Sequence, residues 1–183
     1  ADFALENHDG AELTLAQLRE LDAGSWFSSE YAGERIPTLA QALEEIAPRL
    51  RFVIEIKGEA MADAVARVIA ESTVAPEDLM IFSFHRAAVD RIARIQPLLP
   101  TTWLLESVPS DAAGRKEVVR SALQARVSAL GMSHKRATAE MVRAAHEVGL
   151  LVFTWTVNDE ADMRRMIQLG VDGLISDRPD AAL

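Results

Sequence analysis

The chain of 183 residues contains no cysteine and few aromatic residues. The lack of cysteine excludes disulfide bonds, thiolate nucleophiles and cysteine-bound metals, and it leaves the redox compartment open. Basic residues are also in deficit, because 19 Lys and Arg stand against 28 Asp and Glu, for a net charge of -9. This balance disfavours nucleic acid as a partner and provides no polybasic patch for an anionic membrane.

Long apolar runs and several common functional motifs are missing as well. No run approaches the roughly 18 to 20 residues of a transmembrane helix, and the opening "ADFALENHDG" lacks the regions of a signal peptide. We therefore expect a cytoplasmic location. The sequence has no glycine-rich phosphate loop, no H-E-x-x-H zinc motif and no G-x-S-x-G elbow.

Short apolar runs alternate with amphipathic stretches along the chain. Runs of strand length occupy residues 51–56, 79–83, 101–105, 127–132, 150–157 and 172–176. Helical patterns occupy about 39–50, 60–71, 86–95, 114–125, 138–148 and 160–169. Near-continuous apolar strands linked by helices are typical of a parallel sheet. The alternation therefore predicts an α/β fold, either a doubly wound sheet or a (β/α)8 barrel.

Local signals mark where some of these helices begin. Thr14 with Gln17, and Thr38 with Gln41, have the spacing of a capping box. The stretch "DEADMRRM", residues 159–166, predicts a capped helix start with a solvated charged face.

Polar residues follow the predicted strands at their carboxyl ends, where parallel α/β folds place functional sites. Surface polarity alone would also put polar residues there. Glu55 and Lys57 are a sharper signal. They are two residues apart, so they lie on the same face of the predicted strand, and they place two charges at the end of the apolar run "RFVIEI". One interpretation is an internal ion pair, which adds little net stability. The other is a carboxylate for a hard divalent cation beside an ammonium group for a phosphate.

A series of motifs resembles the glycerophosphodiester phosphodiesterases, in order and over nearly the whole chain. These motifs are "LRELDAGSWFS", "YAGERIPTLAQAL", "VIEIK", "SFH", "VFTWTVND" and "GVDGLISDRPD". The resemblance implies a (β/α)8 TIM barrel that hydrolyses glycerophosphodiesters to glycerol 3-phosphate and an alcohol in lipid metabolism. It also implies a divalent cation cofactor, Ca²⁺ or Mg²⁺.

The resemblance assigns roles to residues of this sequence. Glu55 matches the metal-binding glutamate, Lys57 the lysine that contacts the substrate phosphate, and Trp155 the tryptophan that lines the substrate pocket. Glu55 and Lys57 are therefore the catalytic candidates. Glu106 and His134, which follow two other predicted strands, are further candidates for substrate contact.

The N-terminal motifs of that family, "HRG", "ENT", "E-x-D" and "HD", have no counterpart here. His8 and Asp9 stand too close to Thr14 to match "HD", so we interpret them as an exposed loop. We therefore expect residues 1–183 to form one barrel domain that is incomplete at its N-terminus, with about six βα units. In this interpretation residues 1–37 form an inserted subdomain and its approach, and residues 38–183 supply strands three to eight.

Two alternatives stay open. In the first, the chain is a catalytically dead or truncated barrel that acts as a binding module and closes as a homodimer. In the second, it is a lipid phosphodiesterase of the same fold. The sequence identifies neither the alcohol of the substrate nor the choice between Ca²⁺ and Mg²⁺.

Overall fold

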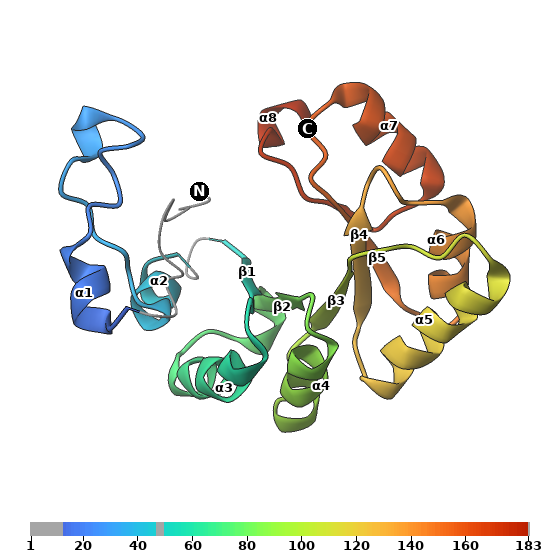
Figure 1. Cartoon of the computed structure of the whole chain (residues 1–183), viewed down its shortest axis with the longest axis horizontal. Coiled ribbons are helices and arrows are strands. Elements are labelled where there is room, and N and C mark those ends of the chain that lie inside the picture. Colours follow the sequence, from blue (N-terminus) through green and yellow to red (C-terminus); the bar gives the residue numbers. More distant parts are fainter. Residues whose placement is uncertain (1–12, 47–49, 183) are drawn as a thin grey trace. The chain divides into compact units, whose positions relative to one another are not determined.

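The structure, a computed structural model, describes residues 13–46 and 50–182. His8 and Asp9 lie outside the described residues. The chain divides between Ala42 and Leu43 into two compact units, which we call the N-terminal unit and the sheet unit (Figure 1). Each unit is considered by itself.

The N-terminal unit contains helix α1 (Leu15–Glu20), the 3-10 turn η2 (Ser29–Tyr31) and the start of helix α2 (Leu39–Ile46). Both predicted capping boxes are confirmed. The Thr14 amide donates to Gln17 Oε1 at 2.8 Å, and the Thr38 amide donates to Gln41 Oε1 at 2.9 Å. In return, each threonine hydroxyl accepts from the amide of its glutamine.

The loop after α1 is organised around the carboxylate of Asp22. It accepts hydrogen bonds from the amides of Ser25, Gly24 and Gly33, at 2.8, 2.9 and 2.8 Å, and from the Ser25 hydroxyl. These donors, the Ser25 amide first, hold the pKa of Asp22 well below its ordinary value. Gly24 is required for close approach, because a Cβ there would lie 1.9 Å from the Tyr31 carbonyl oxygen.

The sheet unit contains six parallel strands in sequential order. The strands are β1 (Phe52–Glu55), β2 (Leu79–Ser83), β3 (Thr101–Leu105), β4 (Ala129–Ser133), β5 (Leu151–Trp155) and β6 (Gly173–Leu174). Helices α3 (Ala62–Glu71), α4 (Arg86–Ile95), α5 (Ala112–Gln124), α6 (Ala139–His146) and α7 (Glu160–Leu169) connect them, and α8 (Pro179–Ala182) follows β6. The predicted α/β class with six βα units is confirmed. Within residues 13–46 and 50–182, no helix is both long and apolar enough to cross a membrane.

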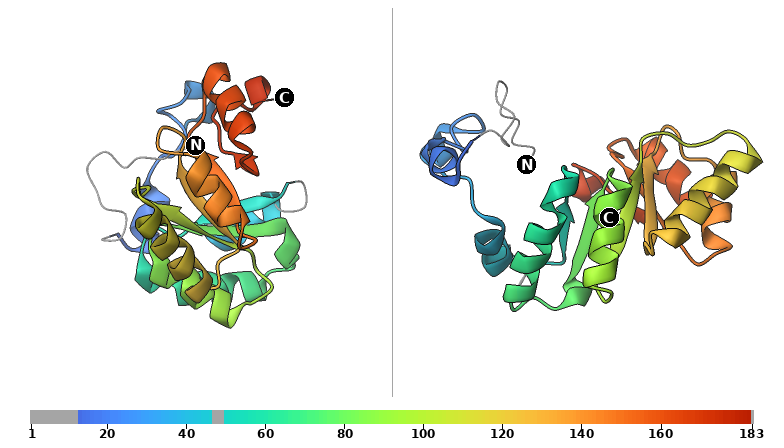
Figure 2. Two further views of the ribbon diagram at one scale, coloured as in Figure 1. Left: turned by 90° about the vertical axis from the view of Figure 1, so that its right-hand side faces the viewer. Right: turned by 60° about the horizontal axis from the view of Figure 1, so that its bottom comes forward.

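The two faces of the sheet have different environments. Helices α3 to α7 lie on its outer side (Figures 1 and 2). Leu105, Leu130, Met132 and Val152 point to that side and are buried in one core with residues of α4 to α7. Burial on this scale, at about 25 cal/mol per Å² of apolar surface, is the main stabilisation of the unit.

The inner face is strongly curled. Strand register places Glu55 beside Phe82 and Gly131 beside Phe153 on this face. The rings of Phe82 on β2 and Phe153 on β5 have centroids 5.7 Å apart. In a flat sheet, strands three places apart would be separated by about 14 Å. The ring contact therefore requires the curl of a barrel wall.

Small inner residues on the strands between these rings make the curl sterically feasible. Gly131 on β4 is buried, and a Cβ built on it would lie 2.5 Å from Leu104 Cδ2 and 3.4 Å from Thr102 Cγ2. The missing side chain at Gly131 lets β3 pack against β4 on the concave face.

We expect Gly131→Ala to lower the free energy of unfolding by about 1–3 kcal/mol, because the methyl group overpacks a buried position. Chemical denaturation measures the change. Adding Leu104→Ala removes the clashing atom, so the extra cost of Gly131→Ala should shrink in that background. Equal costs in both backgrounds would show that the contact with Leu104 is not the cause.

The lowered pKa of Asp22 makes the loop of the N-terminal unit sensitive to acid. Its ionised form is favoured in the folded loop, so the stabilisation is present above the ordinary carboxyl pKa of 3.8 and is lost as the pH falls below it. We expect the amides of Gly24, Ser25 and Gly33 to be protected from hydrogen exchange at pH 6 and to be progressively less protected as the pH falls below 3.8, with the larger part of the loss below pH 3. Asp22→Ala should remove the protection at both pH values. Wild-type protection that does not change over this range, after correction for intrinsic rates, would contradict the assignment.

Candidate functional site

Glu55 and Lys57 stand at the carboxyl end of β1, as the sequence predicted. Lys57 Nζ lies 4.0 Å from Glu55 Oε1, and the side chains are 78% and 38% exposed. Among the described residues the two charges therefore form an ion pair that is exposed, not buried. An exposed pair at this distance contributes about 0–1 kcal/mol. Stability gives little reason for these charges, which remain available to a ligand.

The main chain around Lys57 is held by the last residue of β2 and the loop that follows it. The buried Ser83 hydroxyl donates to the Ile56 carbonyl oxygen at 2.6 Å and accepts from the His85 amide at 3.0 Å. His85 Nε2 lies 3.0 Å from the Lys57 carbonyl oxygen. The motif "SFH" thus has a local structural role beside the candidate site. The motif is visible in the sequence, but these contacts are not.

Trp155 ends β5 and reaches the loop after β2. Its ring meets Phe84 edge to face, with centroids 5.6 Å apart and an interplanar angle of 82°. Phe84 precedes His85, so one short loop contacts both the end of β1 and the indole on β5. Trp155 Nε1 is buried and has no hydrogen-bond partner among the described residues.

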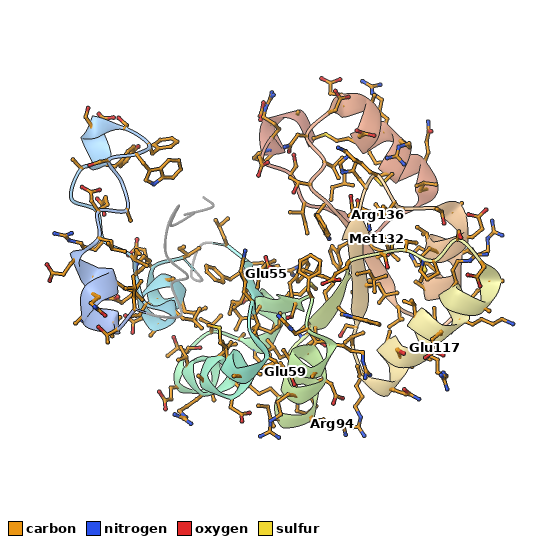
Figure 3. All side chains as sticks on the ribbon, viewed as in Figure 1. Glu55, Glu59, Arg94, Glu117, Met132 and Arg136 are labelled. Carbon is orange, nitrogen blue, oxygen red and sulfur yellow. The ribbon has the colours of Figure 1, made fainter. Side chains whose placement is uncertain are left out.

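Glu106 follows β3 and is exposed. Its carbonyl oxygen accepts a hydrogen bond from the Arg136 guanidinium, which belongs to the loop after β4 (Figure 3). The bond ties the ends of two neighbouring strands together. The structure places the Glu106 carboxylate at the same edge of the sheet as Glu55, and its substrate contact stays a prediction.

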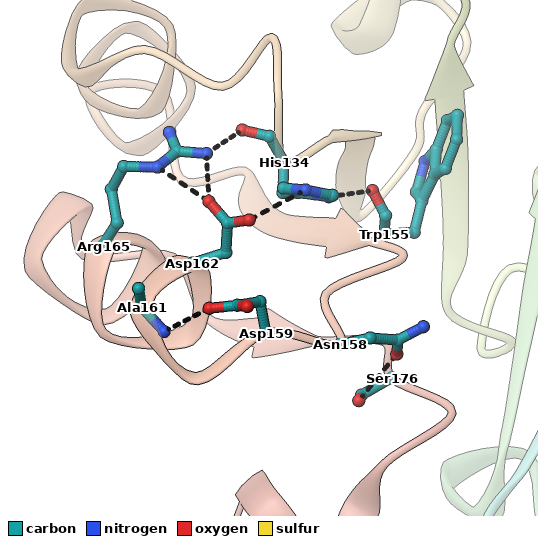
Figure 4. Close-up of polar contacts among 8 residues, drawn as sticks. All are labelled: His134, Trp155, Asn158, Asp159, Ala161, Asp162, Arg165 and Ser176. Atoms are coloured by element: carbon teal, nitrogen blue, oxygen red, sulfur yellow. Dashed lines mark hydrogen bonds and ion pairs between the residues drawn. The ribbon is translucent and has the colours of Figure 1, made fainter.

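His134 follows β4 but is turned into the protein (Figure 4). Its side chain is only 10% exposed, and Nδ1 and Nε2 lie 3.3 Å from the Trp155 carbonyl oxygen and 3.4 Å from Asp162 Oδ2. Arg165 on α7 donates to the His134 carbonyl oxygen at 2.7 Å and to Asp162 Oδ1 at 3.2 Å. These contacts occupy both ring nitrogens, so the geometry does not favour the predicted substrate contact.

Helix α7 departs from its sequence interpretation at these residues. Asp159 caps the helix as predicted, because its carboxylate accepts from the Ala161 amide at 2.9 Å. The charged face is not simply solvated, since Asp162 and Arg165 lie three residues apart and face the end of β4 together. The rotation of α7 about its axis sets the direction of these two side chains. The sequence alone did not reveal which element they would face.

The described residues do not by themselves form a metal site. Across residues 13–46 and 50–182, no three His, Asp or Glu side chains are grouped so that they could hold a metal ion. Glu55 offers one carboxylate, whereas Ca²⁺ takes about six to eight oxygen ligands and Mg²⁺ about six. The donor set around Glu55 therefore does not fit a complete cation site.

Comparison with known proteins places this geometry in a family. The family model described as "Glycerophosphoryl diester phosphodiesterase family" matches residues 5–181. A glycerophosphodiester phosphodiesterase of Caldanaerobacter subterraneus is 31% identical over 178 residues, which cover 94% of this chain and 70% of that protein. One from Bacillus subtilis is 29% identical over 91% of this chain. The matched region spans 62% of the length of the Bacillus relative.

Solved structures show the same fold. An Oleispira antarctica phosphodiesterase, in complex with its product sn-glycerol-3-phosphate, superposes with a TM-score of 0.77 at 24% identity, over 94% of this chain and 70% of that one. A glycerophosphodiester phosphodiesterase from Parabacteroides distasonis gives 0.76 at 21% identity, over 92% and 68%. These likenesses confirm the fold, and the family match extends over almost the whole sequence. The chain belongs to the glycerophosphoryl diester phosphodiesterase family.

Proposed function

We propose that this protein hydrolyses glycerophosphodiesters to glycerol 3-phosphate and an alcohol. The observation that carries the proposal is the placement of Glu55 and Lys57. By the resemblance they correspond to the family's metal-binding glutamate and phosphate-contacting lysine, and they lie 4.0 Å apart, exposed, at the carboxyl edge of a parallel sheet. Functional sites of barrels of this kind lie at that edge.

The reaction adds water across one phosphorus–oxygen bond. The oxygen of water, or first a hydroxyl of the glycerol moiety, forms the new bond to phosphorus, and the bond to the alcohol oxygen breaks. That oxygen takes up a proton as it leaves. The Lys57 ammonium is suited to hold a phosphate oxygen and to offset its negative charge as the bonds change.

Two further side chains would define the substrate pocket. Trp155 supplies an apolar wall, whose ring contacts the ring of Phe84. Glu106 is an exposed carboxylate able to accept hydrogen bonds from the glycerol hydroxyls. Neither role involves proton transfer to or from these two side chains.

The family resemblance implies that the reaction uses a divalent cation, Ca²⁺ or Mg²⁺, and the carboxylate of Glu55 would be one of its ligands. Because the described residues do not complete a cation site, no chemical step is assigned to the metal. The cytoplasmic location and the homodimer expected from the sequence stay predictions.

The decisive variant is Glu55→Gln, which removes one charge and keeps the shape of the side chain. We expect it to lower the hydrolysis of glycerophosphocholine by the full-length protein at least about a hundredfold, because Glu55 is the carboxylate that would help hold a cation, and that cation would offset the charge of the phosphate. Glu77→Gln is the matched control, since Glu77 is an exposed glutamate in the 3-10 turn η4 (Pro76–Asp78) at the opposite edge of the sheet. Release of glycerol 3-phosphate gives the rate.

Unchanged turnover in Glu55→Gln would contradict the assigned site. A well-folded wild-type protein that releases no product from any of several glycerophosphodiesters would instead favour the binding module.

The cation is tested separately. We expect EDTA to abolish turnover and added Ca²⁺ or Mg²⁺ to restore it, because a bound cation would offset phosphate charge that Lys57 alone cannot balance. Titration of each ion into the EDTA-treated protein measures the requirement and identifies the preferred metal. Full activity in EDTA would show that hydrolysis does not depend on a removable cation.

A further inference from the structure

His134 has contacts that set it apart from the other residues at the strand ends. It lies directly after β4, yet its side chain is only 10% exposed. The Trp155 carbonyl oxygen accepts from the His134 amide at 2.9 Å and faces His134 Nδ1 at 3.3 Å. A carbonyl oxygen can only accept, so the ring contact is a hydrogen bond when the imidazole carries a hydrogen on Nδ1.

The opposite side of the imidazole ring is held by helix α7. Asp162 Oδ2 lies 3.4 Å from Nε2, and Arg165 bridges the Asp162 carboxylate and the His134 carbonyl oxygen (Figure 4). Arg165 and Asp162 are 42% and 37% exposed, so the network runs from solvent on α7 to the buried ring. A partner on each side fixes the plane of the imidazole.

The imidazole of His134 contacts the main chain of Trp155, the residue whose indole is predicted to line the substrate pocket. Trp155 is the last residue of β5 and pairs with Ser133 of β4. Its carbonyl oxygen accepts the amide of His134, the residue that follows β4. Two donors from His134 on one oxygen limit rotation of the main chain at Trp155, and hence the direction in which the indole leaves the strand.

We infer that His134 is a positioning residue for Trp155, and that it sets substrate affinity through the main chain of β5 without touching the substrate. The inference about affinity rests on the proposed function. The inference about the position of the indole does not. Asp162 and Arg165 act one step further out, by orienting the imidazole.

Two substitutions test the contacts of the two ring nitrogens one at a time. In His134→Asn the side-chain amide occupies the place of Nδ1 and still donates to the Trp155 carbonyl oxygen, while the contact with Asp162 is lost. In His134→Gln the longer side chain reaches toward Asp162, and the donor beside Trp155 is lost. A residue that only fills space would respond to both changes in the same way.

The first readout is fluorine NMR of the full-length protein labelled with 5-fluorotryptophan. The chain has three tryptophans, and loss of one signal in Trp155→Phe assigns the resonance of Trp155. We expect His134→Gln to shift or broaden that resonance and His134→Asn to leave it close to wild type. The signals of Trp26 and Trp103 serve as internal controls and should not move.

The second readout is the steady-state kinetics of glycerophosphocholine hydrolysis. His134→Gln should raise KM by about three- to tenfold, the effect of one hydrogen bond, with kcat changed less than twofold. His134→Asn should stay near wild type. In a Trp155→Phe background, the effect of His134→Gln on KM should largely disappear, because the indole that it positions is absent.

The outcomes distinguish this inference from the proposed function. Equal responses of the Trp155 resonance to Asn and Gln, or none to either, would overturn the positioning role. A changed resonance with an unchanged KM would overturn the link to affinity. No turnover in the wild-type protein would refute the proposed function. The fluorine NMR comparison would then still decide whether His134 positions Trp155. If His134→Gln does not fold, His134→Leu replaces it, because leucine fills the space but has no donor for the Trp155 carbonyl oxygen, with broadening of the Trp155 signal expected and an unchanged signal counting against the role.

Discussion

The contact between Phe82 and Phe153 is the interaction on which the geometry of the sheet unit depends. Their rings meet 5.7 Å apart although two strands separate β2 from β5. Such a contact is possible only on the concave side of a curled sheet, where the strands between carry small residues such as Gly131. The curl also turns the carboxyl ends of the strands toward one another. Lys57, His85 and Trp155 therefore become linked through one short loop, although they are far apart in the sequence.

The order of the elements was predictable because parallel strands are covered on the outside by helices and read as apolar runs. The ends of the elements were less predictable, because apolar residues also pack outside regular structure. The run 150–157 corresponds to a strand that ends at Trp155, yet Val157 is fully buried in the loop beyond it. The run 172–176 gives only the two-residue strand Gly173–Leu174. Apolar character reports burial, and burial continues past the last residue of the strand, where the Val157 amide still donates to the Ile175 carbonyl oxygen at 2.8 Å.

The candidate site was predictable to the extent that its residues break a local pattern. Glu55 and Lys57 interrupt an apolar strand, which is costly unless the charges reach solvent or a ligand, and the structure exposes both. The contacts of His134 break no such pattern. They depend on the rotation of α7 about its axis and on its packing against the end of β4, which bring Asp162 and Arg165 to the imidazole. A sequence gives the spacing of residues along one helix but not the element that this face will meet.

The polar groups at this edge divide according to burial. The charges suited to meet a ligand are exposed, so keeping them costs little solvation. The buried groups of Ser83 and His134 are satisfied by main-chain and side-chain partners, because an unpaired polar group away from water is costly. Trp155 Nε1 departs from this rule, since it is buried without an acceptor among the described residues. A donor left in that state costs about 1–3 kcal/mol, and an acceptor brought by the substrate would recover part of that cost. The hydroxyls of Thr101, Thr102 and Thr154 are likewise buried without a partner among the described residues, and of these four groups only the indole nitrogen belongs to a residue predicted to line the substrate pocket.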